Sequence, residues 1–471
     1  MESKKADSQD AIANEETRVA KAASHIGIYD QWLKARHSDG PSEPLVIEGE
    51  SFLVNEALST AEIAAGEMKK RVEFLERWAK QHPEQRTSKT VYKIAELIAD
   101  SYNTTGFSDA IVNMSMEAGY PRMCLEYFEH YIDKGFSEQL TFLCCNCFLM
   151  AMWNFSDKSP QWRVEFAKAG AIKPLLSYLE RSSVVEKKSP TEEYVIFIVI
   201  NTVSNMSRSI ELKVDFLEHK AVEILQPYLD NSSELQKLMV ILTLAHVLSD
   251  TPEATKLAHE HGVVPTLVRY CKMAMKNQNR TCLLVHKSIQ TMTVGYSLEE
   301  LGEGLLLLAA NDDIKQSLMD NGVAEIVDYL LAVEDDPVLT NLGIDLLWTL
   351  CFLPSVRKAL IEGPGDPLGR LRECAKSSKT ADVRRNSLKA LTFIENWEKK
   401  VAAAEELGNN DSQRRSSAAG GDAKNGHIFL SYSWKQQATV LRIKHFLSNN
   451  GFKVWVSLAL CSFVLFQFPI F

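Results

Sequence analysis

The sequence has no surplus of basic residues. Its 471 residues include 52 Lys and Arg against 61 Asp and Glu, which gives a formal net charge of −9. A nucleic-acid-binding protein needs basic side chains to neutralise phosphates, so this balance argues against a nucleic-acid partner. The hydrophobic and charged fractions, 45% and 24%, are those of an ordinary globular protein.

The short motifs of several enzyme classes are also missing. The sequence contains no GxxxxGK[ST] phosphate loop, no HExxH motif and no GxSxG nucleophile elbow. Its nine cysteines include one tight group, Cys144-Cys145-Asn146-Cys147, without a further Cys or His pair at zinc-finger spacing. A metal or redox site is one interpretation of this group, but the apolar residues around it favour buried thiols. We expect no catalytic, cofactor-binding or metal site.

Targeting signals and long apolar runs are scarce as well. No apolar region follows Met1, and Glu2 excludes N-myristoylation. Scattered free cysteines without a signal peptide indicate a reducing, cytoplasmic setting. The uncharged tail at 458–471 has 14 residues, fewer than the roughly 20 that cross a bilayer, so a membrane partner is not expected. We interpret this tail as the product of a truncated domain, with a tail anchor or a buried strand as alternatives.

The spacing of apolar residues predicts helices over most of the chain. Residues 1–50 are polar and are predicted to be mostly disordered. From 51 to 400 the apolar residues recur at helical spacing, as they do from Val91 to Ile98. Nothing in this span alternates with period two for long enough to predict a sheet.

One phrase repeats within the helical span: the end of a helix, a small turn, and the start of an apolar helix. Its turns fall at Gly119, Gly170, Lys220, Gly262, Gly322 and, in a degenerate copy, Gly363. Successive turns are roughly 42 to 60 residues apart, close to the 40–47 of armadillo and HEAT units. The widest interval, from Gly262 to Gly322, is predicted to hold an extra helix or a loop.

These phrases resemble the armadillo repeat. Three helix ends also resemble the last helix of that repeat: Met152 to Ser156, Val203 to Ser207 and Leu347 to Leu350. The resemblance covers about 110–400. It implies an all-α fold, an armadillo/HEAT-like right-handed α-solenoid over 51–400, with clear repeats from about 110 and with Trp153 and Trp348 buried.

The same resemblance implies a binding surface. Third helices of armadillo repeats form a groove that binds a protein or peptide, and their asparagines often hold an extended peptide backbone. Asn154 and Asn205 occupy that position here. The alternative is that these two residues cap their own helix ends.

The residues after the solenoid are small and polar, and 402–425 is predicted to be a flexible linker. Within the linker, Arg414-Arg415-Ser416-Ser417 fits a basophilic kinase site with Ser417 as the acceptor. The alternative is a solvated linker in which the arginines are incidental.

Residues 427–457 predict a strand, an amphipathic helix, a Gly turn and a second strand, which is the start of a parallel α/β domain. Phe429-Leu430-Ser431-Tyr432 and Gly451 to Trp455 resemble the beginning of a flavodoxin-like TIR domain, of the armadillo–TIR type found in invertebrates and loosely Sarm-like. The alternative is the start of a generic flavodoxin-like domain. The fragment is incomplete, because a doubly wound sheet needs several more such units.

Together these features predict a non-catalytic protein-interaction scaffold, or adaptor, in TIR-linked signal transduction of the innate-immune type. Some TIR domains hydrolyse NAD through a glutamate far beyond the second strand, and no acidic residue follows Asp422 here. We therefore do not expect an enzyme, and we expect TIR–TIR self-association only of a complete form. The alternatives are an armadillo-regulated TIR NAD hydrolase, as a full-length form, and a general armadillo adaptor of the β-catenin or importin type.

Overall fold

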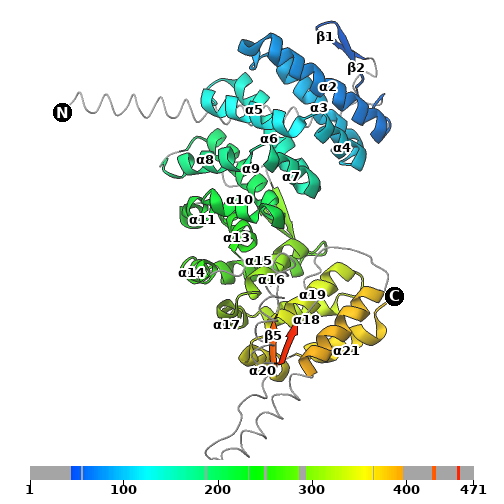
Figure 1. The fold of residues 1–471 in the computed structure, drawn as a ribbon, viewed down its shortest axis with the longest axis vertical. Helices are drawn as coiled ribbons and strands as arrows, with labels where there is room; N and C mark the ends of the chain where they lie inside the picture. The colour runs from blue at the N-terminus through cyan, green and yellow to red at the C-terminus, as the bar shows by residue number, and fades with distance from the viewer. Residues whose placement is uncertain are drawn as a thin grey trace, which may run out of the picture. The chain divides into compact units, whose positions relative to one another are not determined.

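The computed structural model describes residues 44–54, 57–185, 188–231, 233–248, 252–285, 293–363, 365–395, 427–430 and 453–456. The chain divides into two compact units, Met1–Ile394 and Glu395–Phe471. The described part of the first unit is built mainly of α-helices (Figure 1).

Helices of the first unit recur in sets of three, stacked one after another (Figure 1). The described residues contain six sets: α4 (Asp109–Glu117), α5 (Tyr120–Lys134) and α6 (Gln139–Lys158); α7 (Pro160–Lys168), α8 (Ile172–Ser183) and α9 (Pro190–Ser207); η3 with α10 (Ile210–Leu212, Lys213–Glu218), α11 with α12 (Ala221–Leu225, Pro227–Asn231) and α13 (Glu234–Leu248); α14 (Pro252–Glu260), α15 (Val263–Met275) and α16 (Leu298–Ala309); α17 (Asp312–Asp320), α18 (Val323–Ala332) and α19 (Pro337–Leu350); and α20 (Pro354–Glu362), α21 (Pro367–Ser377) and a helix over 381–395. This arrangement is an armadillo-like α-solenoid.

The third helices α6, α9, α13, α16 and α19 pack side by side in that order, and we call them the third-helix ladder. Its middle members, α9 and α13, are buried on nearly every side. Every residue of α9 from Tyr194 to Ser207 is buried, and so are all but two of those from Leu235 to Leu248 on α13. A helix that is hydrophobic on all sides must lie inside the protein, so the ladder carries the core from one set to the next.

The turns between first and second helices lie where the sequence predicts them. Gly119, Gly170, Gly262 and Gly322 have φ of 74°, 93°, 61° and 87°. This left-handed region favours glycine because a Cβ atom would crowd the following carbonyl. Lys220 adopts the same region at the third turn in chain order, with φ of 55°.

A helix pair and a hairpin precede the six sets. The pair is α2 (Ala61–Gln81) and α3 (Lys89–Thr105), joined through η2 (Pro83–Gln85). The hairpin pairs β1 (Leu45–Ile47) with β2 (Glu50–Phe52) in antiparallel fashion. Fully buried Phe52 meets Phe74 of α2 edge to face at 5.5 Å between ring centroids. Buried Arg71 donates to the carbonyl oxygens of Leu53 and Leu97, which fixes the hairpin to both helices.

The expectation of a span without sheet is wrong at two places. The first hairpin crosses the predicted boundary at residue 50, and a second, β3 (Thr281–Val285) with β4 (Thr293–Ser297), occupies the interval from Gly262 to Gly322. Its strands alternate, with Cys282 and Tyr296 buried and Leu283 exposed. Five residues per strand give too short a period-two signal to stand out among helices.

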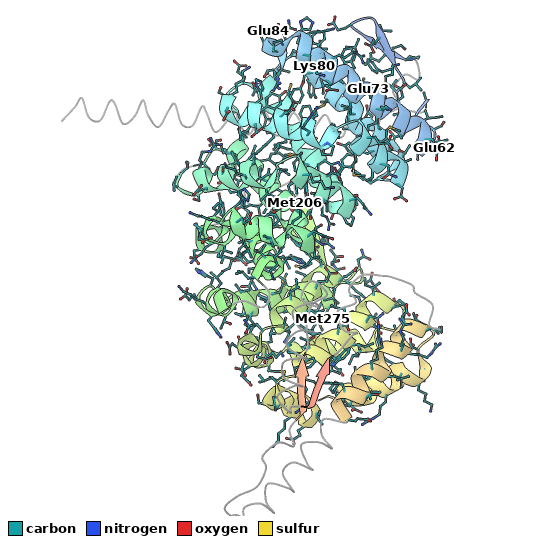
Figure 2. All side chains as sticks on the ribbon, in the orientation of Figure 1. Glu62, Glu73, Lys80, Glu84, Met206 and Met275 are labelled. Carbon is teal, nitrogen blue, oxygen red and sulfur yellow. The ribbon has the colours of Figure 1, made fainter. Side chains whose placement is uncertain are left out.

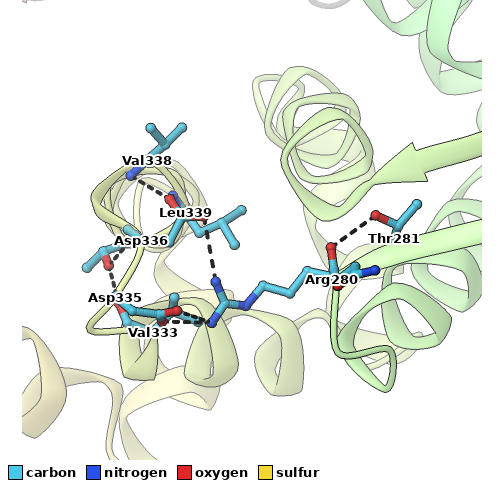
Figure 3. Close-up of polar contacts among 9 residues, drawn as sticks. Arg280, Thr281, Val333, Asp335, Asp336, Val338 and Leu339 are labelled. Carbon is cyan, nitrogen blue, oxygen red and sulfur yellow. Dashed lines mark hydrogen bonds and ion pairs between the residues drawn. The ribbon is translucent and has the colours of Figure 1, made fainter.

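Arg280 fixes the base of the second hairpin to the next set (Figure 3). Its carbonyl oxygen accepts from the Leu298 amide at 2.8 Å. Its guanidinium lies 2.7 Å from Asp335 and 3.7 Å from Asp336. Asp336 also caps the N-terminus of α19 by accepting from the amides of Val338 and Leu339. The connections ahead of α16 and of α19 are therefore held together by one side chain.

The prediction that Trp153 and Trp348 are buried is only partly right, because both are partly exposed. Trp153 packs edge to face on Phe197 at 5.6 Å, and Trp348 lies 6.1 Å from Phe393, each measured between ring centroids. Each tryptophan thus packs on an aromatic ring of a neighbouring helix and is still partly exposed.

In the second unit, β5 (His427–Leu430) and β6 (Lys453–Val456) pair in parallel, with His427 opposite Lys453. Parallel pairing agrees with the predicted strand–helix–strand order. The amphipathic helix predicted between these strands, the linker with Ser417, the tail at 458–471 and residues 1–43 lie outside the described residues. Among the helices that are described, none is both long and apolar enough to span a bilayer.

We expect Lys220→Gly to raise the free energy of unfolding by about 0.5–1 kcal/mol, because it removes a side chain from left-handed backbone. Gly170→Ala should lower it by about 1–2 kcal/mol, although nothing lies within 4 Å of the added Cβ. Calorimetric melting of the two variants checks both signs. A destabilised Lys220→Gly would mean that the lysine side chain holds this turn.

Candidate functional site

Charged side chains gather around the C-terminal ends of α6, α9 and α13 and the first half of α16. They come from five different elements, and we call them the polar cluster: Asp157 on α6, Arg163 on α7, Arg208 directly after α9, His246 on α13, and Glu300 and Glu303 on α16. Because the middles of α9 and α13 are buried and apolar, the charged groups of these two helices lie near the helix ends.

Arg163 is built into the end of α6. Its side chain is buried, its Nε donates to the Ser156 carbonyl, and its Nη2 donates to the Asp157 carbonyl at 3.1 Å. The last carbonyls of a helix have no partner within the helix, and a cation there also complements the helix dipole. Arg357 repeats the arrangement four sets later, where its Nη1 donates to the Cys351 carbonyl beyond α19.

Arg208 is placed to reach across the ladder. Its Nη2 lies 3.8 Å from the Glu303 carboxylate, and both side chains are about one-third exposed, at 29% and 31%. Burial, together with the nearby charge of Arg208, lowers the pKa of Arg163 to about 10. The Arg208 guanidinium thus lies close enough to disfavour the charge of Arg163.

On α16, the nearby charge of Arg208 does not offset the burial of the Glu300 and Glu303 carboxylates. Burial raises the pKa of Glu300 to about 7, although the charge of Arg208 opposes the shift. Burial also raises the pKa of Glu303. His246 responds in the opposite direction, since burial and the charges of Arg208 and Arg163 lower its pKa to about 4. At neutral pH the cluster therefore holds a neutral imidazole between groups of both signs.

The cysteine group is buried, as the sequence indicates. Cys144, Cys145 and Cys147 lie in the interior of α6. Burial raises the pKa of Cys144 to about 12 and raises that of Cys145 as well, which disfavours the reactive thiolate. Throughout the described part of the chain, no three His, Cys, Asp or Glu side chains are placed to hold a metal ion.

The two predicted asparagines have different surroundings. Asn205 is only 5% exposed, and its Nδ2 donates to the Trp153 carbonyl at 3.3 Å and to Ser156 Oγ at 3.2 Å. It therefore caps the end of the neighbouring helix α6 rather than the end of its own. Asn154 is partly exposed. Contact of either residue with a partner remains a prediction.

Sequence reasoning missed the charged members of the cluster. For His246 the signal was its position in the repeat. It lies two residues before the last residue of α13, and Asn205 occupies the equivalent position in α9. Arg163 also had a signal, since Pro160 and Pro354 open helices in which the third following residue is an arginine. Nothing local marks Glu300 or Glu303, which reach the cluster through packing alone.

No family model and no curated protein matches the sequence. Solved structures resemble it in fold. An engineered protein from a structural genomics consortium is 16% identical, with a TM-score of 0.45, over 71% of this chain and 73% of that chain. A designed armadillo repeat protein in complex with the peptide (KR)4 is 16% identical, with a TM-score of 0.36, over 58% and 98%. Computationally designed armadillo repeat proteins for modular peptide recognition are 17% identical, with a TM-score of 0.37, over 57% and 98%.

Glu300→Gln should stabilise the protein at about pH 8 and have little effect near pH 4.5. The folded-state pKa of Glu300 is raised, so its favourable contribution is complete below the ordinary value and is lost as the pH rises through about 7. We expect a gain of about 1–3 kcal/mol at the higher pH, seen as a higher melting temperature. Glu73, on the exposed side of α2 (Figure 2), provides the control Glu73→Gln, which should be neutral at both pH values. Equal effects of Glu300→Gln at both pH values would contradict the shift.

Asn205→Ala should lower the free energy of unfolding by about 1–3 kcal/mol, because it removes the buried amide that donates to two groups of α6. Asn154→Ala, at a partly exposed position, should stay within about 0.5 kcal/mol of the native protein. Denaturant unfolding of both variants measures the difference. If the two losses are equal, the interhelical role given to Asn205 is wrong.

Proposed function

We propose that the chain is a non-catalytic interaction scaffold that binds an extended segment of a partner protein along the third-helix ladder. The observation that carries this proposal is the polar cluster, which gathers charged groups from five elements without fully neutralising them. Desolvated ionised groups are unfavourable unless they are paired. Polar groups of a bound partner would supply those pairs.

The contact surface begins at the end of α6. Trp153 and Asn154 are adjacent and partly exposed, and Asp157 of the cluster follows within one helical turn. An aromatic ring beside an amide suits an extended backbone, because the amide can both donate and accept while the ring packs on a side chain. Since the Asn205 amide already donates to α6, Asn154 is the stronger candidate for backbone contact.

The charged end of the surface would select the partner. Arg208 and Glu303 are both partly exposed, so each can exchange its 3.8 Å ion pair for a contact with a bound segment. A segment that carries charged or strongly polar side chains fits this position better than an apolar one. The buried groups Arg163 and Asn205 hold the helix ends in place and are not proposed as contacts.

The proposal extends to TIR-linked signalling in the cytoplasm, with the solenoid as the binding part and residues 427–457 as the start of a TIR-like unit. The parallel pairing of β5 and β6 supports a strand–helix–strand unit there. It also favours a second candidate function, an armadillo-regulated NAD hydrolase in a complete form. Release of nicotinamide from NAD by the purified chain would favour that enzyme over the scaffold.

A peptide display library panned against the full chain tests binding, followed by calorimetric titration of the best peptide. Asn154→Ala and Arg208→Ala should each weaken binding about tenfold or more, equivalent to about 1.4 kcal/mol, without lowering the melting temperature by a comparable amount. Glu73→Gln should bind as the native chain does. Failure to select any peptide, or equal affinity for all variants, would refute a binding surface at this place.

A further inference from the structure

The tripeptide Lys-Ser-Pro occurs twice in the sequence, at Lys158–Pro160 and at Lys188–Pro190. Both copies begin a helix in the same manner. The serine is the N-cap and the proline is the first helical residue, in α7 and in α9 respectively. Their surroundings differ, because Ser159 is only 3% exposed whereas Ser189 is partly exposed.

Ser189 directly precedes α9, and the described residues between α8 and Ser189 are exposed or partly exposed. Val184 is 80% exposed and Val185 is 43% exposed. Lys188 donates from Nζ to the Val185 carbonyl at 2.7 Å. Ser189 itself has extended backbone, with φ of −68° and ψ of 156°, as a residue before proline prefers. The described residues that lead into Ser189 therefore lie at the surface, where they are accessible to other proteins.

We propose that Ser189 is a phosphorylation site for a proline-directed serine/threonine kinase, and that the buried Ser159 is not. In the reaction Ser189 Oγ forms a bond to the γ-phosphorus of ATP while the bond from that phosphorus to the β–γ bridging oxygen breaks. ADP leaves, and the hydroxyl proton passes to the catalytic base of the kinase.

Access to the acceptor requires only the start of α9 to open. The first amides of a helix have no partner within the helix, so the Ser189 hydroxyl is held there by the capping box. Serine Oγ and the Ser189 amide each donate to Glu192 Oε2 at 2.7 Å, and the Glu192 amide donates back to Ser189 Oγ at 3.2 Å. Helix ends open more readily than helix interiors.

Phosphorylation would replace this capping box. The modified oxygen has no proton to donate, and a phosphate of nearly two negative charges would repel Glu192 and Glu193. Burial already raises the pKa of Glu193, although the charge of Lys188 opposes the shift. The helix N-terminus and Lys188 would attract the phosphate. Glu192 would therefore be displaced while the phosphate caps α9.

Incubation of the full chain with a proline-directed kinase and Mg·ATP, followed by peptide mapping, tests the site. We expect phosphate on Ser189, none on Ser159, and loss of the product in Ser189→Ala. A synthetic peptide of residues 184–194 should also be modified, which shows that the kinase reads the motif. A phosphorylated peptide with an unmodified full chain would overturn the proposal, and so would equal modification of Ser159 and Ser189 in the full chain.

Hydrogen exchange then tests the consequence at the cap. The Ser189 amide loses its carboxylate partner on phosphorylation, so its exchange should become on the order of tenfold faster. Amides in the middle of α9, from Phe197 to Thr202, should exchange as before. Unchanged exchange at Ser189, or faster exchange along all of α9, would contradict the replacement of the capping box.

Discussion

The packing of α9 between α6 and α13 is the interaction on which the rest of the first unit depends. These helices are too apolar to be exposed singly, and each covers the next. In a solenoid, stability is the sum of contributions within each repeat and across each interface. Here the interfaces dominate at the centre, because an isolated α9 would expose aromatic and β-branched side chains on every side. The six sets therefore share one core.

The position of the polar cluster follows from this constraint. Charged groups are unfavourable in the buried middles of α9 and α13, so they lie near the helix ends. The last carbonyl groups of a helix have no hydrogen-bond partner within the helix. Arg163 and Arg357 satisfy those carbonyls at α6 and α19, and Asn205 adds a donor from the adjacent helix. The same crowding desolvates Glu300 and His246. The cluster thus follows from how the helices of the ladder end and pack. Its desolvated charged groups are only partly paired with one another, and this makes it a candidate contact surface.

Local chemistry made the repeats readable from the sequence. A glycine with positive φ is selected by its own backbone conformation. The turns at Gly170, Gly262 and Gly322 could therefore be located from the local sequence, without knowledge of tertiary contacts. Features that depend on contacts between residues far apart in the sequence could not be located in this way. The second hairpin is stabilised by α15 and by Arg280 with Asp335, a partner 55 residues away. The exposure of Trp153 and the place of Glu303 beside Arg208 depend on how successive sets pack.

The central claim is that the third-helix ladder is one shared, buried element that supports the candidate site. Native-state hydrogen exchange of the full chain tests it most directly. We expect α9 and α13 to exchange most slowly, at similar rates, and far more slowly than the partly exposed first helices α10 and α14. Exchange in α9 and α13 as fast as in α10 and α14, or at rates unrelated to each other, would contradict a shared core and remove the support for the site.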